Sequence, residues 1–298
     1  MTTTTHPSPQ VRRGTPAPGT QHHGVLRIIG TTLTWAFASF NVLVLLFMLF
    51  SSFKTTKEIF RAPWAPPSSL HFENWSQAWS NGGFGSAAVN TILVVAASSV
   101  SVLVIAAPAA YALSRTQTRL AGGLTVFFTL GIGIPTQVTI IPIFVMMAKV
   151  NLVNNLFGLY VVYTAVSLPF TVFLLTGFFR SLPGRLEEAA AIDGAGVVRT
   201  FVQIMLPLAR SGLVTALILN IIGLWHETLI ALVFIQDQDK STLSLSLLSF
   251  MSTITSFSDN PNWGALFAGV SILVLPMLAL YVWLGRRIVE GITVGATK

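Results

Sequence analysis

The chain has 298 residues, of which 53% are hydrophobic and only 9% are charged. Soluble domains carry charge on about a quarter of their residues, so this composition excludes an ordinary soluble protein and predicts a chain embedded in a bilayer. The net charge of +7 is spread over several loops and not gathered on one face with aromatic residues, which argues against a nucleic-acid partner. The chain has no cysteine, which excludes disulfides and thiolate metal sites.

The N-terminal part of the sequence changes character twice. Residues 1–24 are rich in Thr, Pro, His and Gly and are predicted to form a disordered cytoplasmic tail. The apolar run at 25–50 is longer than the apolar region of a signal peptide and lacks a small-residue cleavage pattern, so we interpret it as the first transmembrane helix. Residues 51–85 contain prolines, aromatic residues and a Gly-Gly pair, a composition that predicts an extracytoplasmic loop with short helices.

Residues 86–285 form the predicted membrane core, with five further apolar stretches that each reach the roughly 20 residues needed to cross a bilayer. The predicted fold class is therefore an all-α membrane protein with six transmembrane helices. The six expected spans run approximately from 28 to 50, 86 to 114, 120 to 148, 156 to 179, 211 to 236 and 264 to 285. Residues 286–298 are predicted to be a cytoplasmic C-terminal tail.

Prolines lie inside four of the expected spans, where each one removes a helix hydrogen bond and favours a kink. They are Pro108, Pro135, Pro142, Pro169 and Pro276. Bent helices can enclose a pathway, although proline is also simply more frequent in membrane helices than in soluble ones. The sequence has no detectable internal repeat, so the inverted-repeat architecture of many secondary transporters is not supported.

The distribution of basic residues predicts the orientation. With the N-terminus in the cytoplasm, twelve basic residues fall in inner segments and five in outer segments, which satisfies the positive-inside rule and places both termini in the cytoplasm. The inner residues are Arg12, Arg13, Arg27, Arg115, Arg119, Arg180, Arg185, Arg199, Arg210, Arg286, Arg287 and Lys298. The outer residues are Lys54, Lys57, Arg61, Lys149 and Lys240.

The inner segment 180–207 is predicted to fold as helix, turn, helix. Leu186, Ala189 and Ala190 share one helical face because of their spacing. Gly194 and Gly196 then interrupt the helix, since glycine readily adopts the left-handed backbone that ends a helix and redirects the chain. A second apolar series follows from residue 197 to 205, before the fifth expected span begins.

A fixed spacing of residues runs through this segment. It consists of Glu188-Ala189-Ala190, then Gly194 after three residues, then Ile204, Leu206 and Pro207 after nine more. At average residue usage, the joint chance of these seven positions is roughly one in 10⁸. The spacing resembles the signature cytoplasmic loop of ABC-importer permeases.

Other short segments extend the resemblance from about residue 28 to the C-terminus. They are Ser51-Ser52-Phe53-Lys54, Glu73-Asn74-Trp75, Ile134-Pro135, Ile141-Pro142 and Gly291-Ile292-Thr293-Val294-Gly295-Ala296. Together with the loop they resemble the carbohydrate-uptake, maltose-permease-like family of inner-membrane subunits. The resemblance implies a type I ABC importer permease fold in a bacterial cell membrane, and import of a di- or oligosaccharide.

The resemblance also implies partners. They are a second homologous permease in a heterodimer, a dimer of ABC ATPases and an extracytoplasmic solute-binding protein, beside membrane lipid. This chain has no G-x-x-x-x-G-K-[ST] phosphate loop, so we expect it to bind no cofactor and to be no enzyme, with ATP and Mg²⁺ held by the partner ATPase. The tail Gly291–Lys298 is expected to reach the ATPase dimer interface.

In this family the loop helix enters a cleft of the ATPase and transmits its closure to the membrane helices. Carried onto this sequence, the ATPase-coupling residues are Glu188, Ala189, Ala190, Asp193, Gly194, Ile204, Leu206 and Pro207. The physical requirement is a rigid lever, which a packed helix can provide.

The fifth expected span carries His226 and Glu227, although an ionisable group inside a membrane costs about 2.5–3.5 kcal/mol on insertion scales. Asn220 and Gly223 lie seven and four residues before Glu227, which predicts one shared face directed at the bundle interior. That face either lines the translocation pathway or lets Glu227 tie helix ends together, and we favour the structural role. The family often has Trp-Asn-Glu here, so the departure at His226 leaves the role of that position open.

Gln137, Asn90 and Tyr163 are weaker pathway candidates, because single polar residues in spans usually bond a neighbouring backbone. Two alternatives stay open. One is an ABC importer permease for another solute, such as glycerol phosphate or a polyamine, because the loop motif does not report the cargo. The other is an ion-coupled transporter that uses His226 and Glu227. Catalytic motifs such as H-E-x-x-H and G-x-S-x-G are absent from the sequence.

Overall fold

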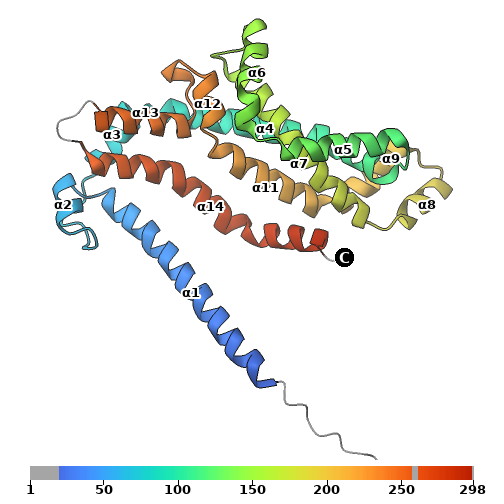
Figure 1. Ribbon diagram of the computed structural model, residues 1–298, viewed down its shortest axis with the longest axis horizontal. Coiled ribbons are helices and arrows are strands. Elements are labelled where there is room, and N and C mark those ends of the chain that lie inside the picture. Colours follow the sequence, from blue (N-terminus) through green and yellow to red (C-terminus); the bar gives the residue numbers. More distant parts are fainter. Residues whose placement is uncertain (1–19, 257–260, 297–298) are drawn as a thin grey trace, which may run out of the picture. The chain divides into compact units, whose positions relative to one another are not determined.

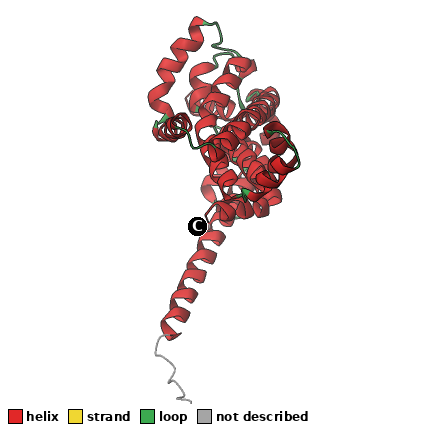
Figure 2. Cartoon of the chain, turned by 90° about the vertical axis from the view of Figure 1, so that its right-hand side faces the viewer, coloured by secondary structure: helices red, strands yellow, loops and turns green. Residues whose placement is uncertain are grey.

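Every regular element in the described part of the chain is a helix, as the colouring of Figure 2 makes plain. The computed structural model describes the backbone of residues 20–256 and 261–296, and the side chains of 27–254 and 261–285. The expected all-α fold class is confirmed. Within these ranges four single helices are long and apolar enough to cross a membrane, and the number reaches six if each of two bent helix pairs counts as one span.

Internal contacts divide the chain into two units, residues 1–47 and 48–298. Helix α1 (Thr20–Ser51) forms the described part of the first unit and runs into the second. It begins at Thr20, so residues 20–24 are helical although they were expected in the disordered tail. Residues 1–19 of that tail lie outside the described residues. The side chains of α1 are mostly apolar and exposed, Trp35 and Phe37 among them, as suits a helix surrounded by lipid.

The segment expected as the first outer loop holds two short helices, α2 (Thr56–Arg61) and α3 (Glu73–Asn81). Thr55 and Glu58 form a capping box at the start of α2. The hydrogen bond from Ser68 and the backbone N–H of Thr55 lower the pKa of Glu58 from 4.5 to about 2. Lys54 is buried, and its ammonium group donates to the carbonyl oxygens of Ala62 and Pro63 just past the end of α2.

The central pair of the second unit is α4 (Phe84–Arg115) and α7 (Leu156–Ser181), which pack together along their length. Small side chains of α4 such as Ala106 and Ala110 are buried, and small residues let membrane helices approach closely. Ser98 donates to the carbonyl oxygen of Tyr160, and the hydroxyl groups of Ser101 and Tyr160 lie 2.8 Å apart. The pair therefore forms a well-connected block.

The third expected span, 120–148, is not one helix. Helices α5 (Arg119–Gly133) and α6 (Thr136–Lys149) meet at an angle of 104°. Pro135 has no N–H to continue the helix, and it pushes Ile134 into an extended conformation with φ −87° and ψ 114°. The kink expected at Pro135 is thus a full break of the helix, and the two helices together can still form the third span.

The fifth expected span, 211–236, is also interrupted. Helix α11 (Arg210–Trp225) stops before His226, and a separate α12 (Leu229–Phe234) follows. A short 3-10 turn (Gln238–Lys240) and an apolar helix α13 (Leu243–Ser256) then occupy the segment between the fifth and sixth expected spans. Serines alternate with leucines in α13 and weaken its sequence signal, yet Ser244 and Ser246 are buried.

The last helix, α14 (Trp263–Ala296), is longer than expected. Its backbone continues past residue 285 through most of the predicted C-terminal tail. The side chains of the proposed tail contact Gly291–Lys298 lie outside the described residues. Pro276 sits inside α14, and the indole N–H of Trp225 donates to the carbonyl oxygen of Leu273 one turn earlier, at 3.0 Å. This bond ties the end of α11 to the middle of α14.

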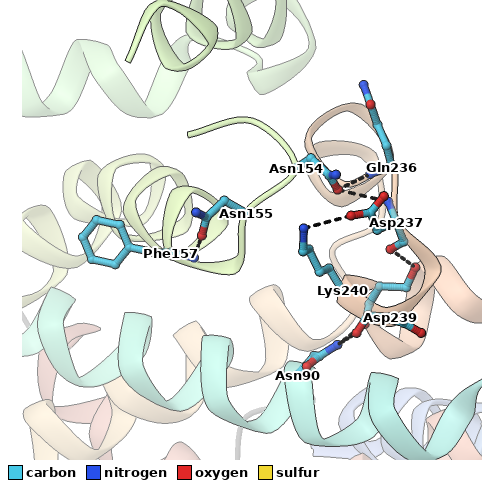
Figure 3. A network of polar contacts seen from close by, with 9 residues as sticks. Asn90, Asn154, Asn155, Phe157, Gln236, Asp237, Asp239 and Lys240 are labelled. Atoms are coloured by element: carbon cyan, nitrogen blue, oxygen red, sulfur yellow. Dashed lines mark hydrogen bonds and ion pairs between the residues drawn. The ribbon is translucent and has the colours of Figure 1, made fainter. Parts of the chain in front are cut away.

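Segments expected on the outer side lie together at one end of this unit. Thr56 donates to the carbonyl oxygen of Pro261, and Asn74 accepts a hydrogen bond from Asn262. The loop after α6 and the loop after α12 also contact each other, as Figure 3 shows. The side-chain oxygen of Asn154 accepts the backbone N–H groups of Gln236 and Asp237 at 3.0 Å each. Figure 1 places α3 and α13 at this end, and α8 and α9 at the opposite one.

Candidate functional site

The motif loop folds as expected into helix, turn and helix. Helix α8 (Arg185–Ile192) begins after Pro183-Gly184, and α9 (Val197–Thr200) begins after Gly196. Between them Gly194 has φ +76°. Its N–H donates to the carbonyl oxygen of Ala191, and the N–H of Ala195 donates to that of Ala190. These two bonds are the Schellman arrangement that ends a helix and satisfies its last carbonyl groups.

Most of α8 projects away from the bundle. Glu188, Ala189, Asp193 and Gly194 are exposed, whereas Ala190 is buried. The motif residues Glu188 and Ala189 are therefore accessible to another protein. Two acidic residues, Glu187 and Glu188, stand in the first turn of α8, where they complement the helix dipole.

An exposed apolar surface continues beyond the turn. Val197 and Val198 are 75% and 76% exposed, and Ile192 at the end of α8 is 87% exposed. Gly196, Val197, Val198, Arg199, Val202 and Gln203 line a groove of about 590 Å³. Such an exposed apolar patch marks a contact surface for a partner protein or for lipid.

The second half of the motif is packed into the bundle. Ile204 and Leu206 lie against a core cluster that contains Met205 and Ala209, both fully buried. Residues Phe201–Met205 form a π-helical turn, in which the N–H of Leu206 reaches the carbonyl oxygen of Phe201. Pro207 is exposed in the short α10 (Leu206–Leu208), and the chain bends by 73° before α11. The motif thus joins an exposed helix to a buried base.

Arg115 fixes the loop to the bundle, a contact that sequence reasoning missed. Its Nε lies 2.7 Å from the Oε1 atom of Glu187, and its Nη2 donates to the carbonyl oxygen of Leu182 at 3.1 Å. Close by, Tyr111, Phe179 and Phe201 form an aromatic triangle with ring centroids 5.1 to 6.2 Å apart. The available signal was the opposite charge of Arg115 and Glu187 in two segments expected on the same side.

The carboxylate of Glu227 accepts three hydrogen bonds from its neighbours. It lies past the end of α11 and accepts the backbone N–H groups of Ile230 and Ala231, at 2.7 and 3.2 Å, at the start of α12. Tyr163 on α7 donates its hydroxyl to the same carboxylate at 2.9 Å, and Ser244 donates to the backbone carbonyl oxygen. The favoured structural role fits this geometry, because the group joins α7, α12 and α13.

The expected shared face of Asn220, Gly223 and Glu227 is not present, since α11 ends at Trp225. Asn220 is buried and donates to Thr171 on α7 and to the carbonyl oxygen of Ala216. Gly223 is exposed, with open space where a Cβ atom would lie. Asn220 and Glu227 therefore both bond to side chains of α7, whereas Gly223 is exposed.

Of the other polar candidates, Asn90 is buried and hydrogen-bonded, whereas Gln137 and His226 are exposed. Asn90 is buried and donates to the carbonyl oxygens of Asp239 and Ser241, the first of which Figure 3 shows. Gln137 is exposed on α6. His226 is exposed too, and it lines a cavity of about 190 Å³ with Ile222, Val274, Met277, Leu278 and Tyr281. No cluster of His, Asp and Glu in the described residues is able to hold a metal ion.

The arrangement of long, bent and broken helices is shared with a solved transporter. A bacterial ABC transporter involved in the import of the acidic polysaccharide alginate matches with a TM-score of 0.75 at 20% identity, over 91% of this chain and 99% of that one. At this identity the match defines the fold alone, which is that of an ABC importer permease.

Sequence relatives define the family. Residues 102–293 match the family described as binding-protein-dependent transport system inner membrane component. The diacetylchitobiose uptake system permease protein NgcG of Streptomyces coelicolor is 36% identical, with 86% of this chain and 84% of that protein aligned. The melibiose/raffinose/stachyose import permease protein MelC of Bacillus subtilis is 30% identical, with 92% and 97% aligned.

The chain therefore belongs to the family of binding-protein-dependent inner-membrane components, the permease subunits of ABC importers. It is a multi-pass membrane protein and a transporter subunit, not an enzyme.

Proposed function

We propose that this permease imports a sugar, specifically a di- or oligosaccharide, across a bacterial inner membrane. The names of its relatives support this cargo, since NgcG and MelC are both permeases for oligosaccharides. The alternative cargoes, glycerol phosphate and polyamines, have no support among these relatives.

The observation that carries the coupling mechanism is the exposed α8 with its buried base. In this proposal Glu188, Ala189, Ala190, Asp193 and Gly194 present α8 to a groove of the ATPase. Ile204, Leu206 and Pro207 then fix the loop to α11, so that a displacement of α8 reaches the membrane helices. ATP and Mg²⁺ belong to the ATPase, and this chain binds neither.

The proposed assembly contains a second, homologous permease, an ATPase dimer and an extracytoplasmic solute-binding protein. The loop 180–207 and both termini lie in the cytoplasm. Exposed apolar side chains on α5 and α6, such as Phe127 and Val138, are surfaces for lipid or for the second permease. His226, Gly223 and Gln137 are the pathway candidates that remain exposed, whereas Asn220 and Glu227 have partners inside the chain.

The cargo is tested by uptake in cells that lack the chromosomal copy of this permease and carry it on a plasmid. We expect labelled diacetylchitobiose or raffinose to enter only when the permease is present. An excess of unlabelled oligosaccharide should compete, and glycerol phosphate and putrescine should not. Competition by either of the last two, without competition by sugars, would reassign the cargo.

The partners are tested by mass spectrometry of proteins retained with the tagged chain after mild detergent extraction and crosslinking. Recovery of an ATPase, a second permease and a solute-binding protein is the expected result. Uptake that persists after deletion of the recovered ATPase would instead favour an ion-coupled transporter. The three hydrogen bonds that the Glu227 carboxylate accepts within the chain favour a structural role for it over that mechanism.

A further inference from the structure

The guanidinium group of Arg115 joins the ends of three helices. Arg115 is the last residue of α4, Leu182 is the C-cap of α7, and Glu187 stands in the first turn of α8. Arg115 pairs with Glu187 at 2.7 Å and donates to the carbonyl oxygen of Leu182 at 3.1 Å. A single side chain therefore fastens the helix that precedes the turn to the most closely packed pair of the bundle.

Tyr111 of α4 also interacts with the Glu187 carboxylate, and few other contacts hold α8. Of its eight side chains only Ala190 is buried, and only Glu187 is half-buried, while the remaining six are exposed. The segments on either side contain glycines, Gly184 before α8 and Gly194 and Gly196 after it, and glycine allows the backbone to change direction at little cost. Without the contacts of Glu187, α8 has little to prevent it from turning independently of α4 and α7.

The ion pair is placed where it can transmit a displacement. The side chains of Arg115 and Glu187 are only 22% and 21% exposed, so solvent and salt screen their attraction less than in a surface pair. The other ion pair in the described residues, Lys240 with Asp237, is 42% and 54% exposed and spans one short loop. Only the Arg115 pair links separate helices.

We propose that Arg115 and Glu187 are positioning residues of the coupling loop, which transmit movement of α8 to the α4–α7 pair. This inference rests on the proposed function of the loop. The pair makes α8 and α4 move as one body, and the aromatic triangle of Tyr111, Phe179 and Phe201 gives the same junction an apolar support. When the ATPase displaces α8, α4 and α7 follow.

A charge exchange tests the inference in the reconstituted importer with its ATPase and solute-binding protein. Arg115→Glu and Glu187→Arg are made singly and together, and solute uptake per ATP hydrolysed is measured. We expect each single variant to lower this ratio about fivefold or more, the scale of an ordinary coupling free energy. The double variant should recover most of the loss, because the opposite charges face each other again.

A matched control separates the pair from a general effect of charge. Arg119→Glu changes an exposed arginine four residues further on and should leave the ratio unchanged. The inference is overturned if the single variants couple normally, or if the assembled double variant is no better than the singles.

A second variant decides the question if the charge changes prevent assembly. The chain has no cysteine, so Arg115→Cys with Glu187→Cys offers the only two thiols, and a short bis-maleimide can bridge them. Bridging should raise the uptake ratio of this variant towards that of the unaltered chain. A ratio that stays low or falls further after bridging would show that α8 and α4 must move separately.

Variants of the motif itself distinguish a failure of this inference from a failure of the proposed function. Glu188→Lys should uncouple ATP hydrolysis from uptake if α8 docks on the ATPase. If Glu188→Lys uncouples but the charge-exchange variants do not, only the role of the ion pair is wrong. If Glu188→Lys also leaves the ratio unchanged, the coupling role of the loop is wrong.

Discussion

Gly194 has a backbone conformation, with φ +76°, that costs an L-amino acid about 1–2 kcal/mol. A Cβ atom at this position would meet nothing within 4 Å, so replacement by alanine would be unfavourable for conformational reasons alone. We expect Gly194→Ala to loosen the end of α8 and to lower solute uptake per ATP hydrolysed. The ratio is measured in proteoliposomes.

Gly184→Ala is the matched control, because Gly184 has φ −65° and equally open surroundings. It should leave the ratio unchanged. Equal behaviour of the two alanine variants would mean that the left-handed turn does not matter for coupling.

The hydrogen bonds of Glu227 predict that this residue stabilises the assembled importer. Glu227→Ala removes the acceptor of two backbone N–H groups and of the Tyr163 hydroxyl, so it should destabilise the assembled importer by about 2 kcal/mol or more. Glu227→Gln keeps one oxygen acceptor and should lose less. Recovery of the complex in detergent and its thermal unfolding measure the effect.

Sugar preference separates the two roles of Glu227. If the residue is structural, the variants that still assemble transport the same sugars in the same order. A changed order of preference, with unchanged assembly, would place the carboxylate in the pathway. Tyr163→Phe is the control, because it removes one donor and leaves the carboxylate with its two backbone partners.

Asn154 joins two segments of the chain, the loop after α6 and the loop after α12, as Figure 3 shows. Its φ is +56°, and its side-chain oxygen accepts two backbone N–H groups. We expect Asn154→Ala to speed hydrogen exchange in residues 235–241, because both N–H groups lose their acceptor. Asn151→Ala is the control, since Asn151 has the same left-handed backbone, φ +57°, and no side-chain hydrogen bond within the described part of the chain.

If both asparagine variants accelerate exchange in 235–241 to the same extent, backbone strain is the cause and the side-chain contact is not. Mass spectrometry of the digested, deuterated protein resolves this segment. Because the two loops are expected on the outer side, the measurement also reports on the surface that faces the solute-binding protein.

Elements whose position depends on a long apolar run were predictable from sequence. The spans that correspond to α1, α4, α7 and α14 follow from length and composition, and the turn at Gly194 follows from glycine chemistry. The break at Pro135 and the interruption before α12 were missed, because an apolar window does not report whether a proline kinks or ends a helix. Helix α13 was missed because its serines lower the apolar signal, although their neighbours bury them.

Contacts between segments far apart in the chain could not be predicted from the sequence. Arg115 contributed only a charge to the orientation rule, and its pairing with Glu187 depends on how α4 and α7 pack. Asn220 and Glu227 were grouped with Gly223 by helical spacing, an argument that fails once α11 ends at Trp225. Their partners on α7, Thr171 and Tyr163, could be found only from the fold.

For the whole molecule, the absence of cysteine makes orientation directly measurable. Lys57→Cys, Asp237→Cys and Arg185→Cys are made one at a time, and each replaces an exposed side chain. In intact cells stripped of any outer membrane, a membrane-impermeant maleimide should label the first two and not the third. The reverse pattern would invert the proposed topology. Labelling of Arg185→Cys after permeabilisation shows that the site is reactive.

The π-helical turn at Phe201–Met205 has a geometric consequence for α10, which follows it. Such a turn holds about one residue more than an α-turn, and each residue of an α-helix advances the side chain by about 100°. The extra residue therefore rotates the positions of α10 about the helix axis, up to the bend of 73° before α11. Loss of one residue from this turn would turn Leu206 away from the core cluster against which it packs, with no change in the composition of α10.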